Sequence, residues 1–353
     1  MPVTLGASAP NALTLNLDSV FATSLANYNR KLIDNIGKVN VFLNFIMKNG
    51  GYKAVDGGTH IVEPLMYGLA TADWYDGYDE LSTDPTDGIT QALFDWRQLA
   101  VPISYSEKER KLNKERLVDL IDARIRQGEM GIHEKLNQAI LRGAGAGALT
   151  TAQSSGLNGA SGVDPLPLLV DYAPTGARSI GGLAQNTYSW WQNQQKESAA
   201  TSWAGLFNEF QNMYNNCSKG SGGEPNLILC DQTTYETFQA AIYNKYRYLD
   251  NDKNFDFEHF KFKKAVVAWD ECVPNVWANT TDTTTTTGGT AYFLNTQFFK
   301  LRYESSTNFV MGPFQKPVNQ DAKVAHILWM GNLTCNNRRK QGVIGKISRA
   351  IAA

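Results

Sequence analysis

The chain has 353 residues, of which 42% are hydrophobic and 19% charged, and its formal net charge is −1. This composition excludes a disordered protein, and the near-neutral charge excludes a generally basic nucleic-acid binder. The N-terminus lacks a basic segment followed by an apolar one, and no stretch reaches the roughly 18 apolar residues that a membrane span needs. The sequence therefore predicts neither a signal peptide nor a membrane span. The chain is expected to fold in the cytoplasm.

The N-terminal part is predicted to be an extension followed by short helices. Residues 1–17 are small and polar, as is typical of a flexible arm. Asp18 or Ser19 is expected to cap a helix that continues to about Asn35. A second apolar segment, residues 39–47, ends at a stop signal, Asn49-Gly50-Gly51.

Residues 54–106 are strongly acidic and rich in aromatic side chains. Nine carboxylates stand against Arg97 alone, which gives a formal charge of −8. Such a segment cannot build its own core, so its aromatics and its charge need a partner surface, most simply another copy of the chain. Alternation over residues 59–65 and 93–103 predicts the two strands of a long hairpin with a distal loop between them. The residues expected at the contact between subunits are Trp74, Tyr75, Asp76, Tyr78, Asp79 and Glu80.

The next stretch predicts one long helix from Glu107 to Leu141. Apolar residues recur at spacings of three and four between Val118 and Ile140. Thirty-five residues rise about 52 Å, which is too long for the core of a compact domain. Gly128 and Gly131 each cost roughly 1 kcal/mol relative to Ala. They are expected to mark either a bend of this helix or a close contact.

The second half of the chain predicts an α/β domain. Residues 143–182 are rich in Ala, Gly, Ser and Pro and are expected to form a linker. Ser202 and Asp231 are expected to cap two helices, the second directly after a buried strand over residues 226–230. Residues 279–289 are expected to form an exposed loop. Further strands are predicted over residues 260–269, 291–303, 323–335 and 342–348.

The C-terminal segment is basic, in contrast to the acidic arm. Residues 290–353 contain nine Lys or Arg and two carboxylates, which gives a formal charge of +7. Arm and C-terminal segment are therefore expected to meet between copies of the chain. The basic partner candidates are Arg338, Arg339 and Lys340. These three residues could instead contact nucleic acid or form a turn that pairs with acidic neighbours. Of these two alternatives the turn is favoured.

No pattern of residues predicts catalysis or metal binding. Cysteines and histidines are scattered without a CxxC pair or an i,i+4 histidine pair, so neither a metal centre nor a cofactor site is expected. Paired carboxylates such as Asp79–Glu80 lie in a polar loop without an apolar pocket that would raise a pKa. The chain is not expected to be an enzyme. The cysteines, expected to be reduced thiols, are Cys217, Cys230, Cys272 and Cys335.

The order of these elements resembles the major capsid protein of tailed double-stranded DNA phages, the Hong Kong 97-like fold. The shared order is an N-arm, an acidic hairpin, a very long helix, a linker, an α/β domain and return strands. Shorter stretches add to the resemblance, namely Asn226–Cys230 with Asp231–Tyr235, Ala291–Asn295, Val318–Ala322, Ile327–Cys335 and Asn337–Val343.

The resemblance implies an α+β fold with defined parts. The N-arm comprises residues 1–35 and the extended β-hairpin loop residues 52–106. The peripheral domain comprises residues 36–51 and 107–182, with the spine helix at 107–141. The α/β axial domain spans residues 183–290, and residues 291–353 form strands that return to the peripheral domain.

The resemblance also implies self-assembly as pentamers and hexamers into an icosahedral shell, in a virion assembled in the host cytoplasm. The extended loop lies over a neighbouring subunit, and the shell encloses packaged DNA that it contacts non-specifically. Scaffolding, portal and cement proteins are the implied partners, and scaffolding is expected to be a separate protein because the chain begins at Met1. Some members cross-link a loop lysine to an asparagine, but the arm has no lysine between Lys53 and Lys108, so a cross-link is not expected.

Two alternatives remain open from the sequence. A cellular nanocompartment shell shares this fold and encloses enzymes instead of a genome. A glycan-binding phage surface module would use the exposed aromatics and form a small oligomer without a closed shell.

Overall fold

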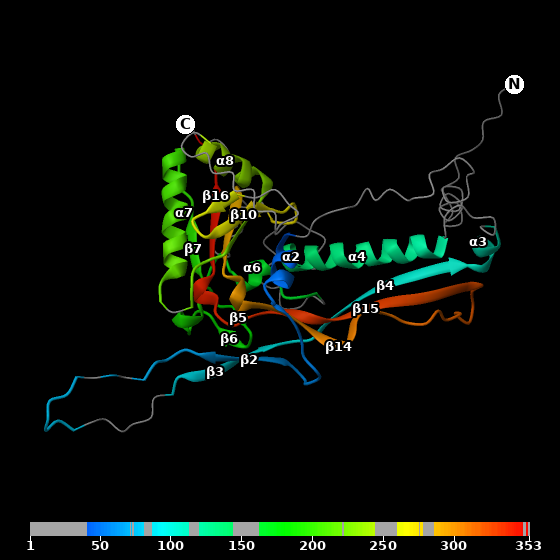
Figure 1. The fold of residues 1–353 in the computed structure, drawn as a ribbon, viewed down its shortest axis with the longest axis horizontal. Helices are drawn as coiled ribbons and strands as arrows, with labels where there is room; N and C mark the ends of the chain where they lie inside the picture. Colours follow the sequence, from blue (N-terminus) through cyan, green and yellow to red (C-terminus); the bar gives the residue numbers. More distant parts are fainter. Residues whose placement is uncertain are drawn as a thin grey trace. The chain divides into compact units, whose positions relative to one another are not determined.

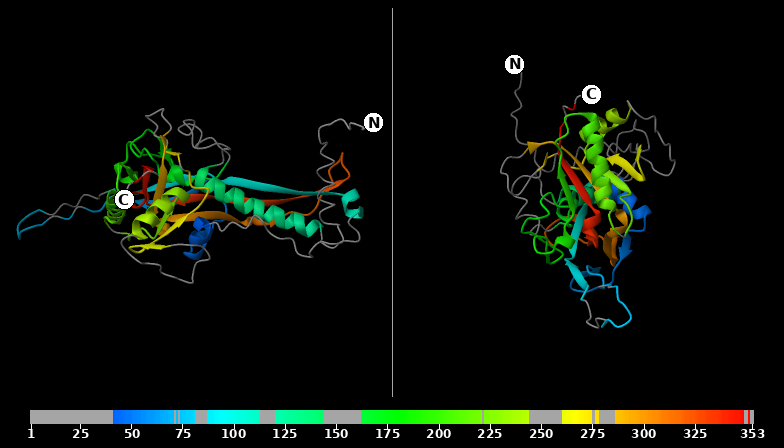
Figure 2. Two further views of the ribbon diagram at one scale, coloured as in Figure 1. Left: turned by 90° about the horizontal axis from the view of Figure 1, so that it is seen from above. Right: turned by 90° about the vertical axis from the view of Figure 1, so that its left-hand side faces the viewer.

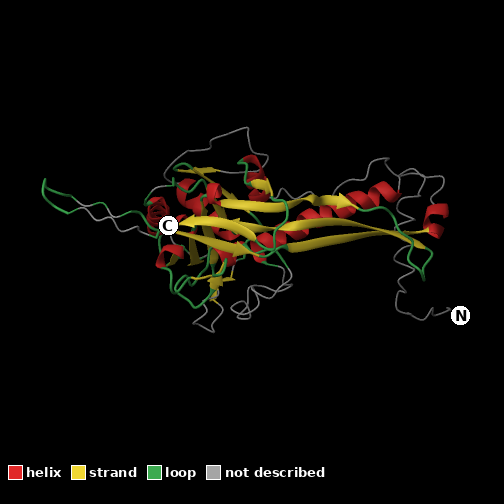
Figure 3. Cartoon of the chain, turned by 90° about the horizontal axis from the view of Figure 1, so that it is seen from below, coloured by secondary structure: helices red, strands yellow, loops and turns green. Residues whose placement is uncertain are grey.

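The computed structural model describes residues 41–70, 72, 74–80, 87–112, 120–143, 162–220, 222–243, 260–274, 276–277, 286–348 and 351. The predicted N-arm, residues 144–161 of the predicted linker and most of the predicted loop at 279–289 lie outside these residues. Helices and strands both contribute, as the α+β prediction requires (Figure 3). No described helix combines the length and the apolar character needed to cross a membrane.

The chain divides into two compact units. The first unit comprises residues 1–38, 99–135 and 306–329, and the second comprises residues 39–98, 136–305 and 330–353. Each unit is described by itself below.

A six-stranded mixed sheet forms the centre of the second unit, with strand order β7-β16-β13-β8-β10-β9. β8 is parallel to β10 and antiparallel to β13, and every residue of β8 is buried. A near-continuous apolar run is typical of a strand covered on both faces. The strands are β7 (Gln194–Glu197), β8 (Leu227–Cys230), β9 (Phe260–Phe262), β10 (Ala265–Trp269), β13 (Gly289–Leu294) and β16 (Gly342–Ile347).

Two helices pack on this sheet, α7 (Trp203–Ser218) and α8 (Gln232–Tyr243). Both predicted caps are confirmed, because Ser202 Oγ accepts from Gly205 N at 3.3 Å and Asp231 Oδ2 accepts from Thr234 N at 3.4 Å.

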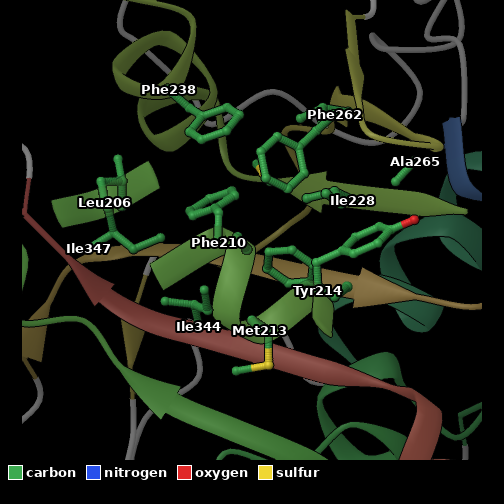
Figure 4. Packing of buried hydrophobic residues seen from close by; sticks show 14 of the residues in the cluster. Leu206, Phe210, Met213, Tyr214, Ile228, Phe238, Phe262, Ala265, Ile344 and Ile347 are labelled. Carbon is green, nitrogen blue, oxygen red and sulfur yellow. The ribbon is translucent and has the colours of Figure 1, made fainter. Parts of the chain in front are cut away.

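Aromatic rings fill the core between the helices and the sheet (Figure 4). The ring of Phe210 stacks on Phe238 with centroids 4.3 Å apart and meets Phe262 edge-on at 6.3 Å. Each fully buried ring contributes about 1.5–3 kcal/mol, so this cluster holds α7 and α8 against the sheet.

Two predicted strands are each divided in the structure. The stretch 260–269 turns at Lys263, whose φ of 54° allows a tight hairpin between β9 and β10. The stretch 291–303 is interrupted by a 3₁₀ helix, η3 (Thr296–Phe298), which separates β13 from β14 (Phe299–Met311). Since β13 and β16 belong to the six-stranded sheet, the prediction that all of 291–353 returns to the peripheral domain is wrong for these two strands.

The predicted hairpin arm is present in the second unit. β2 (Ile61–Met66) and β3 (Ile89–Phe94) pair antiparallel, with Ile61 opposite Phe94 and Met66 opposite Ile89. Beyond these strands the chain continues to the tip of the arm (Figure 1). The predicted strand at 93–103 is divided at Asp95-Trp96, where the Trp96 indole donates to Gly58 O at 2.9 Å. The second part of that stretch belongs to β4 (Arg97–Ser106).

The first unit contains residues of three long strands, β4, β14 and β15 (Ala322–Cys335), each of which also has residues in the second unit. These strands belong to a four-stranded sheet of order β1-β14-β15-β4, whose first strand, β1 (Tyr52–Ala54), lies in the second unit. The short helix α3 (Glu107–Leu112) of the first unit begins at a capping box, because Glu109 N donates to Ser106 Oγ at 3.2 Å and Ser106 N donates to Glu109 Oε2 at 3.0 Å.

The predicted helix from Glu107 to Leu141 corresponds to two helices in the described residues. α3 ends at Leu112, and α4 (Leu120–Arg142) has 23 residues, which rise about 34 Å. Residues 113–119 between them lie outside the described part. The predicted end of the helix is within one residue of the end of α4.

Candidate assembly surfaces

The tip of the arm presents aromatic side chains to solvent. Trp74 and Tyr78 are fully exposed, and 66% of Tyr75 is exposed. A tight turn holds the intervening acids, since Asp76 N donates to Asp79 Oδ2 and Asp79 N donates to Asp76 O, both at 2.8 Å. Glu80 follows and is also exposed. The structure thus brings the six predicted contact residues together on one short segment.

The stem of the arm exposes a second apolar surface, which the sequence analysis did not single out. One face of the β2–β3 hairpin is buried, but the other face is also apolar and lies in solvent. A strand with one covered face normally carries polar residues on the other, so an exposed apolar stripe indicates a docking surface. The signal in the sequence was that apolar residues occupy both alternations. The exposed residues of this stripe are Val62, Met66, Ile89 and Leu93.

A buried carboxylate fixes the root of the arm. Glu63 of β2 is 2% exposed, and its Oε1 accepts from Arg302 Nε at 2.8 Å and from Thr334 Oγ1 at 3.0 Å. Lys300 Nζ lies 3.5 Å from its other oxygen. Burial opposes ionisation, but the hydrogen bond and charge of Arg302, together with Lys300 and Thr334, hold the pKa of Glu63 below its ordinary value. Glu63 therefore belongs to an internal anchor, not to the acidic contact surface.

Arg338 is not a partner for the arm, because it is completely buried. Its guanidinium donates to Leu169 O at 2.7 Å, Trp191 O at 2.9 Å, Asn193 Oδ1 at 3.0 Å and Gln185 Oε1 at 3.1 Å. Burial lowers the pKa of Arg338 to about 10, so it stays charged at neutral pH. The prediction that Arg338 pairs with a neighbour's arm is wrong, since the side chain is buried and its guanidinium donates four hydrogen bonds inside the second unit.

Lys340 is also engaged inside the second unit. Its Nζ donates to the carbonyl oxygens of Lys219, Gly220 and Ser218 at 2.9, 3.0 and 3.3 Å. These carbonyls end α7, where a cation is favoured by the helix dipole. The prediction that Lys340 pairs with a neighbour's arm is therefore wrong as well. Arg339 is exposed and remains a predicted partner.

Most of the remaining basic residues of the C-terminal segment pair with acids of the same chain. Their ion pairs neutralise much of the +7 charge on which the predicted contact between arm and C-terminal segment depended. The pairs, besides those of Glu63, are Lys316–Asp321 at 3.0 Å, Lys323–Glu107 at 3.5 Å and Lys346–Glu197 at 3.0 Å.

The two glycines of α4 have different surroundings. A Cβ at Gly128 would lie 3.2 Å from Ile103 Cγ1 and 3.5 Å from Ile327 Cδ1, whereas a Cβ at Gly131 would meet nothing within 4 Å. α4 continues as a helix through both residues (Figure 2). Close packing against Ile103 accounts for Gly128, while the bend stays a prediction.

The described residues contain no group of three or more His, Cys, Asp or Glu side chains placed to hold a metal ion. All four cysteines are buried free thiols. Burial raises the pKa of Cys217 and of Cys335 to about 12, so neither is a ready nucleophile.

No protein-family model matches the sequence, and no curated protein sequence matches it. The fold, however, is similar to several solved structures. The capsid asymmetric unit of cyanophage A-1(L) aligns with a TM-score of 0.63 at 12% identity, over 92% of this chain and 97% of that one. The holo-SrpI encapsulin complex from Synechococcus elongatus PCC 7942 gives 0.56 at 9% identity, over 97% of both chains. The capsid of a native GTA particle gives 0.56 at 9% identity, over 92% and 96%. The chain thus has the predicted Hong Kong 97-like capsid fold.

Proposed function

We propose that this chain is a structural major capsid protein. Its copies assemble as pentamers and hexamers into an icosahedral shell that encloses packaged double-stranded DNA. The observation that carries the proposal is the arm, which exposes an aromatic tip and an apolar stem on a capsid fold. Such surfaces require a partner, and a neighbouring copy supplies one at every position of a shell.

The interaction energies expected at each arm suit a shell in which every subunit repeats the same contact. Burying one large apolar side chain contributes about 1.5–3 kcal/mol, so the tip and the stem supply the main attraction. An exposed ion pair contributes only about 0.2–1 kcal/mol. The acids of the tip, Asp76, Asp79 and Glu80, therefore act mainly on register and rate of association.

The proposed role also defines the partners and the location. The protein is a component of a virion that assembles in the host cytoplasm, with separate scaffolding and portal proteins and, in some particles, cement proteins. Contact with the genome is non-specific. The role is structural, without a catalytic step, metal or cofactor.

A nanocompartment shell is the second candidate. The encapsulin similarity over 97% of both chains supports it. The two candidates differ in content, since a capsid protects nucleic acid and a nanocompartment protects an enzyme. A glycan-binding surface module would instead remain a small oligomer.

The test combines light scattering and negative-stain microscopy of the purified chain, alone and with a co-expressed scaffold. Closed shells are expected, with nuclease-resistant DNA in particles recovered from infected cells. Protein cargo in place of DNA would support the nanocompartment. A chain that remains a compact monomer at high concentration in both settings would contradict any shell function.

A matched pair of variants connects this result to the arm. The double variant Trp74→Ser/Tyr78→Ser removes the tip aromatics and should leave unassembled subunits or capsomers. Leu112→Ser, at an exposed apolar residue on α3, is the control and should assemble normally. Normal shells from the double variant would show that the tip is not the contact.

A further inference from the structure

A tight two-residue turn contacts the stem of the arm. β5 (Ser179–Ile180) and β6 (Leu183–Ala184) pair antiparallel within the second unit. Gly181 and Gly182 connect them with φ of 61° and 77°, in the left-handed region that a type I′ turn requires. Gly181 O accepts a hydrogen bond from Leu93 N of β3 at 2.9 Å. The β5–β6 turn therefore lies directly against the stem (Figure 1).

The approach of the turn to the stem leaves no room for a side chain at Gly181. A Cβ on Gly181 would lie 2.9 Å from Ala92 Cβ and 3.3 Å from Phe94 Cζ. Both neighbours are buried and belong to the face of β3 opposite the exposed apolar stripe. A Cβ on Gly182 would meet nothing within 4 Å. Gly182 is thus needed for its backbone conformation alone, whereas Gly181 is needed also for the contact with the stem.

Buried hydrogen bonds fix the β5–β6 hairpin to the core of the second unit. Trp191 Nε1 donates to Ile180 O at 3.0 Å, and the Arg338 guanidinium donates to Trp191 O at 2.9 Å. Arg338 also donates to Oε1 of Gln185, the residue after β6, at 3.1 Å. All four residues are buried. A buried network of this kind is rigid, so the turn is a fixed support for the stem.

Two further contacts hold the stem at other points. Tyr67, the residue after β2, stacks on Trp190 with ring centroids 5.0 Å apart and planes 17° apart. Glu63 of β2 is held by Arg302. A hairpin held at one point can rotate about it, whereas contacts at separate points on both strands fix its direction. Leu93 connects this support to the exposed stripe, because its backbone binds the turn and its side chain is 39% exposed.

We propose that Gly181 is a positioning residue for assembly, which seats the stem at one angle on the β5–β6 turn. It acts through Leu93 and Ala92 of the stem. A neighbouring copy then meets the apolar stripe in a single orientation, so that repeated contacts close into one kind of particle. The consequence for the particle rests on the proposed function, whereas the contact itself belongs to the single chain.

The direction of the stem is measured first in the unassembled chain. Spin labels at Ile89→Cys on the stem and at Asn212→Cys on the exposed face of α7 give one distance by pulsed electron paramagnetic resonance. The four native cysteines are buried and should not label. Gly181→Ala should shift or broaden this distance. The N–H of Leu93 should exchange with solvent about tenfold faster in Gly181→Ala than in Gly182→Ala.

Gly182→Ala is the matched control for the backbone. Both variants place an alanine in left-handed backbone, but only Gly181→Ala brings a methyl group against the arm. The distance in Gly182→Ala should therefore equal that of the wild type. An unchanged distance in Gly181→Ala, whether or not its melting temperature falls, would overturn the proposal, because the glycine would then have only a structural role.

Variants at Ala92 test the same contact from the side of the arm. Ala92→Gly removes the methyl group nearest to Gly181, so Gly181→Ala/Ala92→Gly should return the distance toward that of Ala92→Gly alone. No return would contradict the contact. Ala92→Val enlarges this side without straining the turn and replaces Gly181→Ala if that variant does not fold. It should also shift or broaden the distance, and an unchanged distance would overturn the proposal.

Electron microscopy of assembled particles tests the consequence. Gly182→Ala should give particles of wild-type size, and Gly181→Ala a mixture of sizes or open sheets. Wild-type particles from Gly181→Ala, despite an altered distance in the unassembled chain, would overturn the positioning role and leave the shell function standing. If the wild type itself forms no shell, the proposed function fails and with it the role of Gly181 in assembly, while the distance still decides whether Gly181 seats the stem.

Discussion

Arg302 Nε donates a 2.8 Å hydrogen bond to Glu63 Oε1, although the two residues lie 239 positions apart in the sequence. The carboxylate is buried and the guanidinium largely so. The bond links β2 at the root of the arm to β14 of the same unit. The root of the arm is therefore held by a contact with a strand from the C-terminal part of the chain.

Replacing Arg302 by Leu should lower the free energy of unfolding by about 2 kcal/mol, because a hydrogen bond to a buried charge is lost. Chemical denaturation measures this change. Lys323→Leu removes a more exposed ion pair with Glu107 and should cost less than about 1 kcal/mol. Equal losses in the two variants would contradict the anchor.

The same pair predicts a pH dependence with a definite sign. The pKa of Glu63 is lowered in the folded state, so its contribution is fully present above the ordinary value of 4.5. The contribution is lost as pH falls below that value through the lowered pKa. The wild type should therefore lose more stability on acidification in this range than Arg302→Leu does. Parallel pH profiles of the two proteins would show that Arg302 does not lower the pKa of Glu63.

Neighbouring arginines should behave in opposite ways. Arg338→Ala removes the guanidinium from four buried acceptors, of which Asn193 Oδ1 keeps a hydrogen bond from Asp171 N at 3.0 Å. Each group left unsatisfied costs about 1–3 kcal/mol. We expect a loss of at least about 3 kcal/mol or failure to fold. Arg339→Ala changes an exposed residue and should leave the melting temperature within experimental error. A mild effect of Arg338→Ala would show that water replaces the guanidinium easily.

The two glycines of α4 provide a matched pair for stability. Gly131→Ala gains helix propensity in open space and should stabilise the protein by up to about 1 kcal/mol. Gly128→Ala gains the same propensity but brings a methyl group against Ile103, and overpacking costs about 1–3 kcal/mol. Gly128→Ala should therefore melt below Gly131→Ala. A higher melting temperature for Gly128→Ala than for Gly131→Ala would indicate that α4 moves away from Ile103 without an energetic cost.

Local signals in the sequence predicted the elements of the fold well. Ser202 and Asp231 both cap helices as expected, since a cap depends on a residue and the few that follow it. The buried strand at 226–230 was also predicted correctly, because an apolar run is a local pattern. The hairpin arm is present as predicted, but its second strand is β3 (Ile89–Phe94), which overlaps the predicted stretch 93–103 only at Leu93 and Phe94.

The partners of charged residues could not be predicted in the same way. Arg338-Arg339-Lys340 read as an exposed basic cluster, but the first and last of these residues donate to carbonyl oxygens distant in sequence. Net charge over a segment does not reveal which side chains are buried by such long-range contacts. The hydrogen bonds of Asn332 could not be predicted for the same reason, since Asp95, Asp164 and Asn332 lie in three separate segments.

The mature particle should be held together without covalent bonds between subunits. The arm has no lysine between Lys53 and Lys108 that could form an isopeptide bond. Boiled and reduced particles should give one band near 39.1 kDa on a denaturing gel. A ladder of multimers would refute this prediction and point to a lysine outside the arm.

The acidic tip should control how copies recognise one another. The triple variant Asp76→Lys/Asp79→Lys/Glu80→Lys reverses the charge beside the exposed aromatics. It should block or misdirect assembly while the melting temperature of the unassembled chain stays unchanged, because these side chains lie on the exposed arm tip. Light scattering follows assembly, and its rate in the wild type should fall as salt screens the tip.

The partner surface is now more narrowly defined, since Arg338 and Lys340 are buried and Arg339 is the exposed candidate of the three. Arg339→Glu should slow assembly of the wild-type arm and partly restore assembly of the triple variant, because the two reversals re-create an attractive pair. If the triple variant assembles at the wild-type rate at every salt concentration, the electrostatic account is wrong. Trp74, Tyr75 and Tyr78 would then have to explain recognition by apolar burial alone.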